Sequence, residues 1–145
     1  MKLRQWAPHV LINSFTLLIS FPDIAEILPR TGVRYFNISK NFLGDEAFKQ
    51  YADRILEYHE ECRLTKMDFS SCRIGDEGIL HFLKALEEYD GLSCLRVSDN
   101  FISEKIEKVV VEMLDLNKSL VEFAVHGNRI SLSCLSRFLL MILSN

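Results

Sequence analysis

The sequence predicts a right-handed α/β solenoid (horseshoe) with a parallel sheet on its concave face and helices on its convex face. Two observations lead to this fold class. A segment with one apolar pattern occurs four times between Val33 and Ser133, at a near-constant interval. After each segment the apolar spacing changes from the period 2 of a strand to the period 3.6 of a helix. Such units stack side by side, because one unit alone cannot bury its apolar faces.

Each repeat follows the pattern L-x-x-L-x-L-x-x-N/C-x-L. The first positions are Val33, Leu64, Leu92 and Leu120. The ninth positions, which are 31, 28 and 28 residues apart, are Asn41, Cys72, Asn100 and Asn128. Positions four and six share one face of a short strand and should fill the core, whereas positions three, five, seven and eight should face solvent. We expect the ninth side chains to be buried and to bond backbone groups of adjacent coils.

The segment after position eleven predicts a helix with one buried stripe in each repeat. In the last three repeats the stripe residues are Ile79, Phe82, Leu83 and Leu86, then Ile106, Val110, Val111 and Leu114, then Leu135, Phe138, Leu139 and Ile142. The longer first interval should extend the first helix through Leu56 and Tyr58. Carboxylates at 45–46 and 76–77 indicate helix starts. Asp90-Gly91 and Asn117 indicate helix ends in a left-handed conformation.

The domain organisation follows from the repeats. Residues 1–32 should form an N-terminal capping or degenerate repeat segment, with Pro22 opening a short helix to Leu28. Residues 33–145 should form four repeats, at about 33–63, 64–91, 92–119 and 120–145. The apolar run from Val10 to Phe21 has a signal peptide as its alternative interpretation, although it contains four polar residues. The apolar helix 138–143 lacks a polar cap, which predicts either a longer protein or a partner at that end.

Composition limits the classes of partner. The chain has 145 residues and a net charge of -3, which argues against a strongly basic nucleic-acid binder or anionic-membrane binder. No apolar run is long enough to span a bilayer. The four cysteines, Cys62, Cys72, Cys94 and Cys134, form no C-x-x-C pair, so we expect reduced thiols in a cytoplasmic compartment, without zinc. Cys94 should be more exposed than the inert Cys72.

The motif I-G-D-E-G at 74–78, its variant L-G-D-E-A at 43–47 and the 28-residue period resemble ribonuclease-inhibitor-like leucine-rich repeats. The resemblance covers about residues 33–143, and the third and fourth repeats lack the G-D-E-G signature. This subclass occurs in Ran GTPase-activating proteins, NOD-like receptors, tropomodulins, CARMIL-type actin regulators and several ciliary proteins. The resemblance implies the repeat fold and does not specify the family within the subclass.

No nucleotide-binding, metalloprotease or hydrolase motif occurs, and the histidines are isolated, so we expect no enzyme activity, cofactor, metal or small-molecule substrate. The exposed strand row is the candidate partner-binding site: Tyr35, Asn37, Lys66, Asp68, Arg96, Asp99, Glu122 and His126. The leading hypothesis is a non-catalytic protein-interaction or scaffold module, intracellular and within a larger assembly. One alternative is a small-GTPase regulator resembling Ran GTPase-activating proteins, using Arg96 or Arg129. The other is an actin-regulating repeat domain of tropomodulin or CARMIL type.

Overall fold

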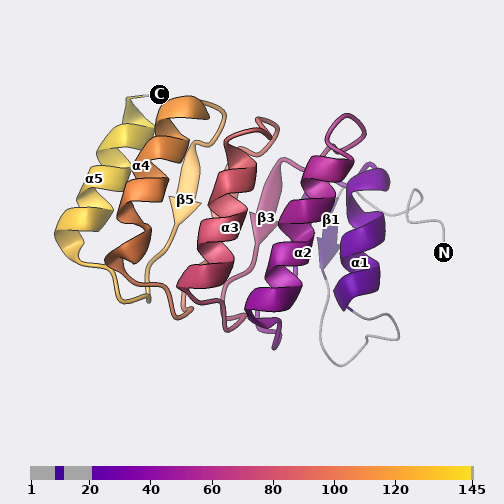
Figure 1. The fold of residues 1–145 in the computed structure, drawn as a ribbon, viewed down its shortest axis with the longest axis horizontal. Coiled ribbons are helices and arrows are strands. Elements are labelled where there is room, and N and C mark those ends of the chain that lie inside the picture. Colours follow the sequence, from indigo (N-terminus) through magenta and orange to yellow (C-terminus); the bar gives the residue numbers. More distant parts are fainter. Residues whose placement is uncertain (1–8, 12–20, 145) are drawn as a thin grey trace.

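The computed structural model describes residues 9–11 and 21–144, which alternate strands and helices along the chain. The strands are β1 (His9–Leu11), β2 (Tyr35–Asn37), β3 (Lys66–Asp68), β4 (Cys94–Arg96) and β5 (Glu122–Ala124). The helices are α1 (Phe21–Ile27), η2 (Leu28–Arg30), α2 (Gly44–Glu57), α3 (Asp76–Leu86), η3 (Glu104–Ile106), α4 (Glu107–Leu116) and α5 (Leu132–Leu143). The order of strands in the sheet is the order in the sequence, and every pairing is parallel. Helices cover one face of this sheet (Figure 1), which confirms the predicted leucine-rich-repeat solenoid.

The strand register places equivalent repeat positions side by side. The fourth positions, Phe36, Met67, Leu95 and Phe123, are Cα partners across β2 to β5. All four side chains are buried, and the sixth positions Ile38, Phe69, Val97 and Val125 are buried beside them. The core therefore lies between the sheet and the helices, as the period-2 spacing predicts.

Aromatic rings fill the core between the first coils. Phe48 of α2 stacks on Phe82 of α3 with a centroid separation of 4.7 Å, and it meets the edge of Phe69 at 4.8 Å. Tyr51 packs against Phe69 at 5.4 Å, and burial raises the pKa of its hydroxyl group. This cluster joins the first two repeats into one apolar unit.

Most residues of the predicted helix stripes are buried, but Leu139 is exposed, and Val111, Leu135 and Ile142 are only half-buried. Leu139 is 57% exposed because α5 is the last described helix and no further coil packs on its outer side. Val111 is half-buried, whereas Met113 is fully buried and takes a place in the α4 stripe. Helix α2 ends at Glu57, and Tyr58 is its C-cap.

The predicted left-handed helix ends are wrong. Helix α3 ends at Leu86, before Asp90. Asn117 does end α4, but in an extended conformation with φ −97° and ψ 109°. Its side-chain amide donates to the carbonyl groups of Leu86 and Tyr89, so it stabilises the end of the preceding helix rather than a left-handed turn of its own.

The N-terminal segment contributes to the same sheet. β1 pairs in parallel with β2, and α1 lies beside α2 (Figure 1). Helix α1 begins one residue before Pro22, and Leu28 lies in the following 3-10 turn. Residues 12–20 of the apolar run considered as a signal peptide lie outside the described residues. None of the helices in the described part of the chain has the length and apolar content to cross a bilayer.

A ladder of side-chain amides connects the coils, as expected from position nine. Asn100 Oδ1 accepts the N–H groups of Cys72 and Ile74 at 2.9 and 3.0 Å. Asn128 Oδ1 accepts those of Asn100 and Ile102 at 3.1 and 3.0 Å. Asn128 is only half-buried, because it lies in the last described coil.

The thiol at position nine of the second coil replaces this amide only in part. Cys72 Sγ donates to the carbonyl groups of Ile38 and Ser70 at 3.3 and 3.5 Å. Burial raises the pKa of this thiol to about 11, which keeps it protonated and unreactive at neutral pH.

The G-D-E-G signature has a direct packing reason. Asp45 Oδ1 accepts the N–H of Gly75 at 2.7 Å, so the carboxylate of one coil caps the helix start of the next. A Cβ atom at Gly78 would lie 2.4 Å from the same oxygen, and glycine leaves the room that this contact needs. The third repeat, which lacks the signature, begins its helix with the 3-10 turn η3 instead.

Candidate interaction surfaces

The concave strands bring most of the predicted site residues together. Tyr35, Lys66, Cys94 and Glu122 are Cα partners in one row, and Asn37, Asp68, Arg96 and Ala124 form the next row. Asp99 and His126 lie in the turns that follow β4 and β5. Neighbouring coils stand about 4.8 Å apart, so these side chains form a continuous surface.

Two of the predicted residues form hydrogen bonds within their own coil. Asn37 Oδ1 accepts the N–H of Ser39 at 2.9 Å, and Asp68 Oδ1 accepts that of Ser70 at the same distance. Both side chains are half-buried. These bonds shape the turn after each strand, so Asn37 and Asp68 have a structural role beside any binding role.

An ion pair crosses the last two concave strands. Arg96 Nε donates to Glu122 Oε1 at 2.7 Å, and about half of each side chain is exposed, 44% and 45%. The guanidinium group lowers the pKa of Glu122, and the carboxylate raises the pKa of Arg96. Lys66 adds a positive charge on the neighbouring coil. Arg96 is therefore held in place on the sheet rather than extended from it.

Cys94 is buried, although position three of the repeat is predicted to face solvent. Cys94 is 4% exposed, because its short side chain lies in the row between the longer side chains of Lys66 and Glu122. Burial, together with a hydrogen bond to Glu122, raises the pKa of its thiol to about 11. Cys94 therefore offers neither a reactive thiolate nor a contact surface.

His126 forms a contact that the spacing of histidines did not predict. Ser98 Oγ and His126 Nδ1 are 3.0 Å apart, which is the pairing of a nucleophile with a base. Ser98 is only 3% exposed, so a substrate cannot reach its oxygen. Among the described residues no carboxylate bonds to His126, and no three ligands cluster as a metal site would need. The pair stabilises the turn and does not form a catalytic triad.

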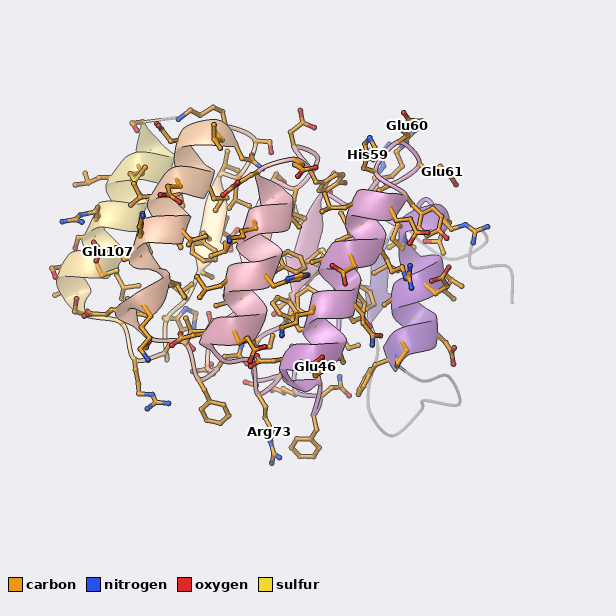
Figure 2. All side chains as sticks on the ribbon, viewed as in Figure 1. Glu46, His59, Glu60, Glu61, Arg73 and Glu107 are labelled. Atoms are coloured by element: carbon orange, nitrogen blue, oxygen red, sulfur yellow. The ribbon has the colours of Figure 1, made fainter. Side chains whose placement is uncertain are left out.

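The rim of the solenoid carries a second row of side chains, at position ten of each repeat. We call it the Phe–Arg rim, and its members are Phe42, Arg73, Phe101 and Arg129. Phe42 is 74% exposed and Phe101 is 56% exposed, and both arginines are exposed. The guanidinium carbon of Arg73 lies 4.0 Å from the centroid of the Phe42 ring. Figure 2 shows Arg73 extending from the lower edge of the molecule.

The predicted site did not include this rim. Of the four rim residues, only Arg129 is named in the sequence analysis, as the arginine that a GTPase regulator would use. The signal was present in the sequence, because phenylalanine occurs twice at a position that lies between two inward-facing ones. A Phe–Arg–Phe–Arg alternation at the repeat interval is unusual for a purely solvated edge.

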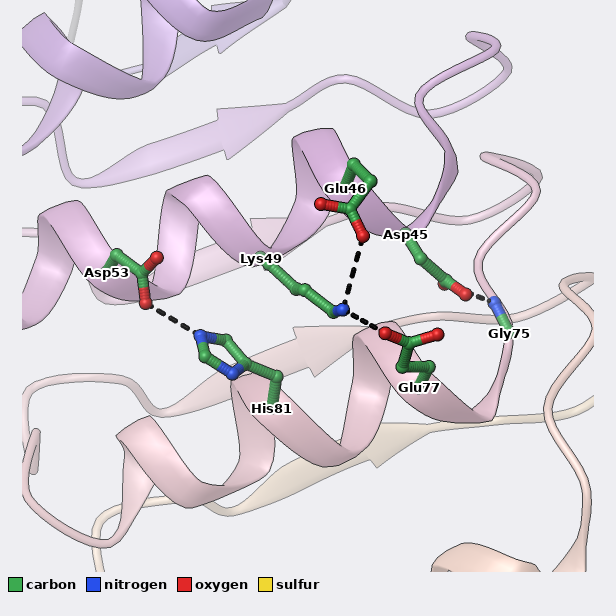
Figure 3. A network of polar contacts seen from close by, with 7 residues as sticks. All are labelled: Asp45, Glu46, Lys49, Asp53, Gly75, Glu77 and His81. Atoms are coloured by element: carbon green, nitrogen blue, oxygen red, sulfur yellow. Dashed lines mark hydrogen bonds and ion pairs between the residues drawn. The ribbon is translucent and has the colours of Figure 1, made fainter.

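The helix face forms a network of ion pairs between coils, shown in Figure 3. Lys49 of α2 pairs with Glu46 and with Glu77 of α3. Asp53 of α2 contacts His81 of α3 at 2.6 Å. These pairs bring together opposite charges of neighbouring helices. Because they are exposed, each contributes little to stability.

The open end of the solenoid exposes apolar side chains of the last helix. The most exposed are Leu132, Leu139, Leu140 and Leu143, at 80%, 57%, 68% and 73%. On its inner side, Phe138 packs against Phe123 with centroids 6.1 Å apart. The outer face is therefore an apolar surface that no described residue covers.

Comparisons with known proteins identify similar folds. No family model matches the chain, and no curated protein sequence does. The structure is similar to that of leiomodin-1 actin-binding site 2, with a TM-score of 0.74 and 17% identity, over 99% of this chain and 85% of that one. It is also similar to the tropomodulin C-terminal domain from Caenorhabditis elegans, with a TM-score of 0.59 and 12% identity, over 86% and 92% of the two chains. These likenesses confirm the α/β leucine-rich-repeat fold.

Proposed function

We propose that this chain is a non-catalytic protein-interaction domain and that its partner is actin. The observation that carries the proposal is the fold match over 99% of this chain to a domain described as an actin-binding site. This favours the actin-regulating alternative of the sequence analysis over an unspecified scaffold. An actin partner would also agree with the cytoplasmic location expected from the cysteines.

The concave surface supports a contact of this kind chemically. Tyr35, Lys66 and Arg96 are residue types with which proteins bind one another, and the strands hold them on a rigid sheet. A rigid surface loses little conformational entropy on binding. We propose that Lys66 and Arg96 contact carboxylates of the partner, with Asp99, Glu122 and His126 at the edge of the same patch.

The test is cosedimentation with filamentous actin, together with binding of fluorescently labelled monomeric actin. We expect a saturable interaction that the double variant Lys66→Glu/Arg96→Glu weakens at least tenfold. Lys84→Glu is the matched control, because Lys84 is an exposed cation of α3 on the opposite, helix-covered face. Thermal unfolding should show that each variant is folded at the assay temperature, although Arg96→Glu also breaks the ion pair with Glu122.

Two results would contradict the proposal. The first is the absence of binding to either form of actin. The second is acceleration of GTP hydrolysis by a Ran-type GTPase, which would restore the competing regulatory hypothesis. Arg96 already pairs with Glu122 at 2.7 Å, and we expect no such acceleration. If the concave double variant still binds actin, actin remains the partner, but the binding surface is not the concave face.

A further inference from the structure

We infer that the Phe–Arg rim is a docking strip for a partner helix that presents apolar and acidic side chains in alternation, one in each turn. The strip lies at the rim and not on the concave strands. It therefore goes beyond the proposed function and does not depend on actin being the partner.

The backbone fixes the spacing of the strip. Gly44 N donates to Cys72 O at 3.0 Å, Phe101 N to Ile74 O at 2.8 Å, and Arg129 N to Ile102 O at 2.8 Å. The coils are thus hydrogen-bonded at the rim as they are in the sheet. Neighbouring backbones in such ladders are about 4.8 Å apart, so the four side chains span about 14 Å over three steps.

This spacing selects a helical partner. A helix presents one side chain per turn of about 5.4 Å, so three steps take about 16 Å. An extended strand presents every second residue, about 6.7 Å apart, so three steps take about 20 Å. Over three steps the length of the helix therefore differs from that of the strip by about 2 Å, and the length of the strand by about 6 Å. Helix positions i, i+4, i+7 and i+11 match the four rim residues in order.

The charges of the strip select acidic residues on that helix. Arg54, Arg96 and Arg137 each pair with a carboxylate. Arg73 and Arg129, by contrast, form no ion pair with any residue of the described ranges. Their guanidinium groups are therefore available to carboxylates of a partner, which they can bind in a bidentate manner.

The carboxylates at the helix starts that follow the strip form no ion pair with its arginines within the described residues, and three of them bond backbone N–H groups of the next coil. Asp45 accepts from Gly75 N, Asp76 from Ser103 N, and Glu104 from Ser131 N, at 2.6 to 2.7 Å. The opposite edge of the molecule is different, since Glu60 and Glu61 project from it (Figure 2). An acidic helix would be repelled there and attracted to the Phe–Arg rim.

The aromatic members supply the apolar part of the contact. Phe42 and Phe101 are two coils apart, which places two largely exposed rings about 10 Å from each other. Arg73 already stacks on the Phe42 ring, so its side chain loses little freedom when a ligand binds. Exposed aromatic and arginine side chains held in this way are typical of interface hot spots.

The experiment uses a synthetic helical peptide with Leu at i and i+7, Glu at i+4 and i+11, and alanine, glutamine and lysine elsewhere. It is titrated into the isotope-labelled chain and followed by amide chemical shifts. We expect saturable shifts centred on the four rim residues. A peptide with Lys in place of both Glu should bind at least tenfold more weakly. The charge-swapped variant Arg73→Glu/Arg129→Glu should reverse this preference.

Controls separate the strip from general charge attraction. Arg34→Glu changes an exposed arginine away from the rim, and Val121→Ala removes an exposed apolar side chain. Neither should change the affinity, whereas Phe42→Ala/Phe101→Ala should lower it at least tenfold. All these side chains are exposed, so thermal unfolding should stay unchanged.

Three results would overturn the inference. One is the absence of shifts at peptide concentrations up to about 1 mM, the range of weak but specific contacts. Another is equal binding of the Glu and Lys peptides, or no reversal in the charge-swapped variant. The last is equal binding of a proline-containing peptide that cannot form a helix, which would exclude the helical partner.

Discussion

Replacing Asn100 with alanine should be among the most damaging single substitutions in this chain. The Asn100 side chain is 6% exposed and makes five hydrogen bonds. Its oxygen accepts two N–H groups of the preceding coil, at Cys72 and Ile74. Its nitrogen donates to the carbonyl groups of Phe69, Val97 and Ser98. Alanine removes all of these bonds and supplies no polar group to replace them.

The magnitude follows from which groups lose their partner. A buried N–H group without an acceptor costs about 1–3 kcal/mol, so the two donors of Cys72 and Ile74 cost about 2–6 kcal/mol together. The carbonyl groups suffer less, because Val97 O still accepts from Asn128 and Ser98 O from Ser71. We expect a loss of about 4 kcal/mol, a large share of the roughly 5–15 kcal/mol that stabilises a typical domain.

The matched comparison is Cys72→Ala, which also introduces alanine at position nine, in the preceding coil. The thiol donates only two weak bonds, at 3.3 and 3.5 Å, so its loss should cost about 1 kcal/mol. Equilibrium urea unfolding, followed by circular dichroism, measures both variants, with an unchanged m-value as the check on the comparison. If Asn100→Ala cost no more than Cys72→Ala, the role assigned to the amide ladder would be refuted.

Three further predictions concern single side chains. Cys72→Asn should raise the free energy of unfolding by about 1–2 kcal/mol, because an amide oxygen can accept two backbone N–H groups of the preceding coil; a lower urea midpoint would contradict this. Gly78→Ala should destabilise the chain by about 1–3 kcal/mol despite better helix propensity, since its Cβ would meet Asp45 Oδ1 at 2.4 Å. The same substitution should cost less in an Asp45→Ala background, which already lacks that oxygen and its cap on Gly75 N. Arg96 lowers the pKa of Glu122 below its ordinary 4.5, so this pair stabilises the fold above pH 4.5 and the contribution disappears as the pH falls through the lowered pKa. Glu122→Gln should therefore weaken the fall in the free energy of unfolding at acidic pH. An unchanged pH dependence would refute a stabilising role for this ion pair.

The repeated pattern was sufficient to predict the parallel sheet and its core. Positions four and six are two residues apart, and the strand geometry gives them one face, so Phe69 and Met67 are buried as expected. The pattern also predicted the amide ladder, because a buried Asn100 requires partners from neighbouring backbones. These predictions depend only on local geometry repeated at a fixed interval.

The errors arise where a side chain depends on the next coil rather than on its own. Position three is solvent-facing by alternation, yet Cys94 is buried because its neighbours in the row have longer side chains. Leu139 continues the helix stripe, yet it is exposed because no described coil follows α5. Ser98 and His126 both occupy position seven, so the repeat register places them side by side, although no pattern of histidines indicates their hydrogen bond.

The candidate surfaces differ in how strongly the stack itself constrains them. Position nine must carry a side chain that bonds the preceding backbone, and Asn100 shows how completely this uses its polar atoms. At position ten the backbone joins the coils, as in the bond from Arg129 N to Ile102 O, and the side chains add the stacking of Arg73 on the Phe42 ring. The stack would therefore accept small polar residues there, whereas the chain carries phenylalanine and arginine in alternation. Exposed Phe42 and Phe101 add nothing to the core, and they are costly to leave in water. The partner helix inferred above would account for them, whereas many polar groups of the concave face already bond within the chain.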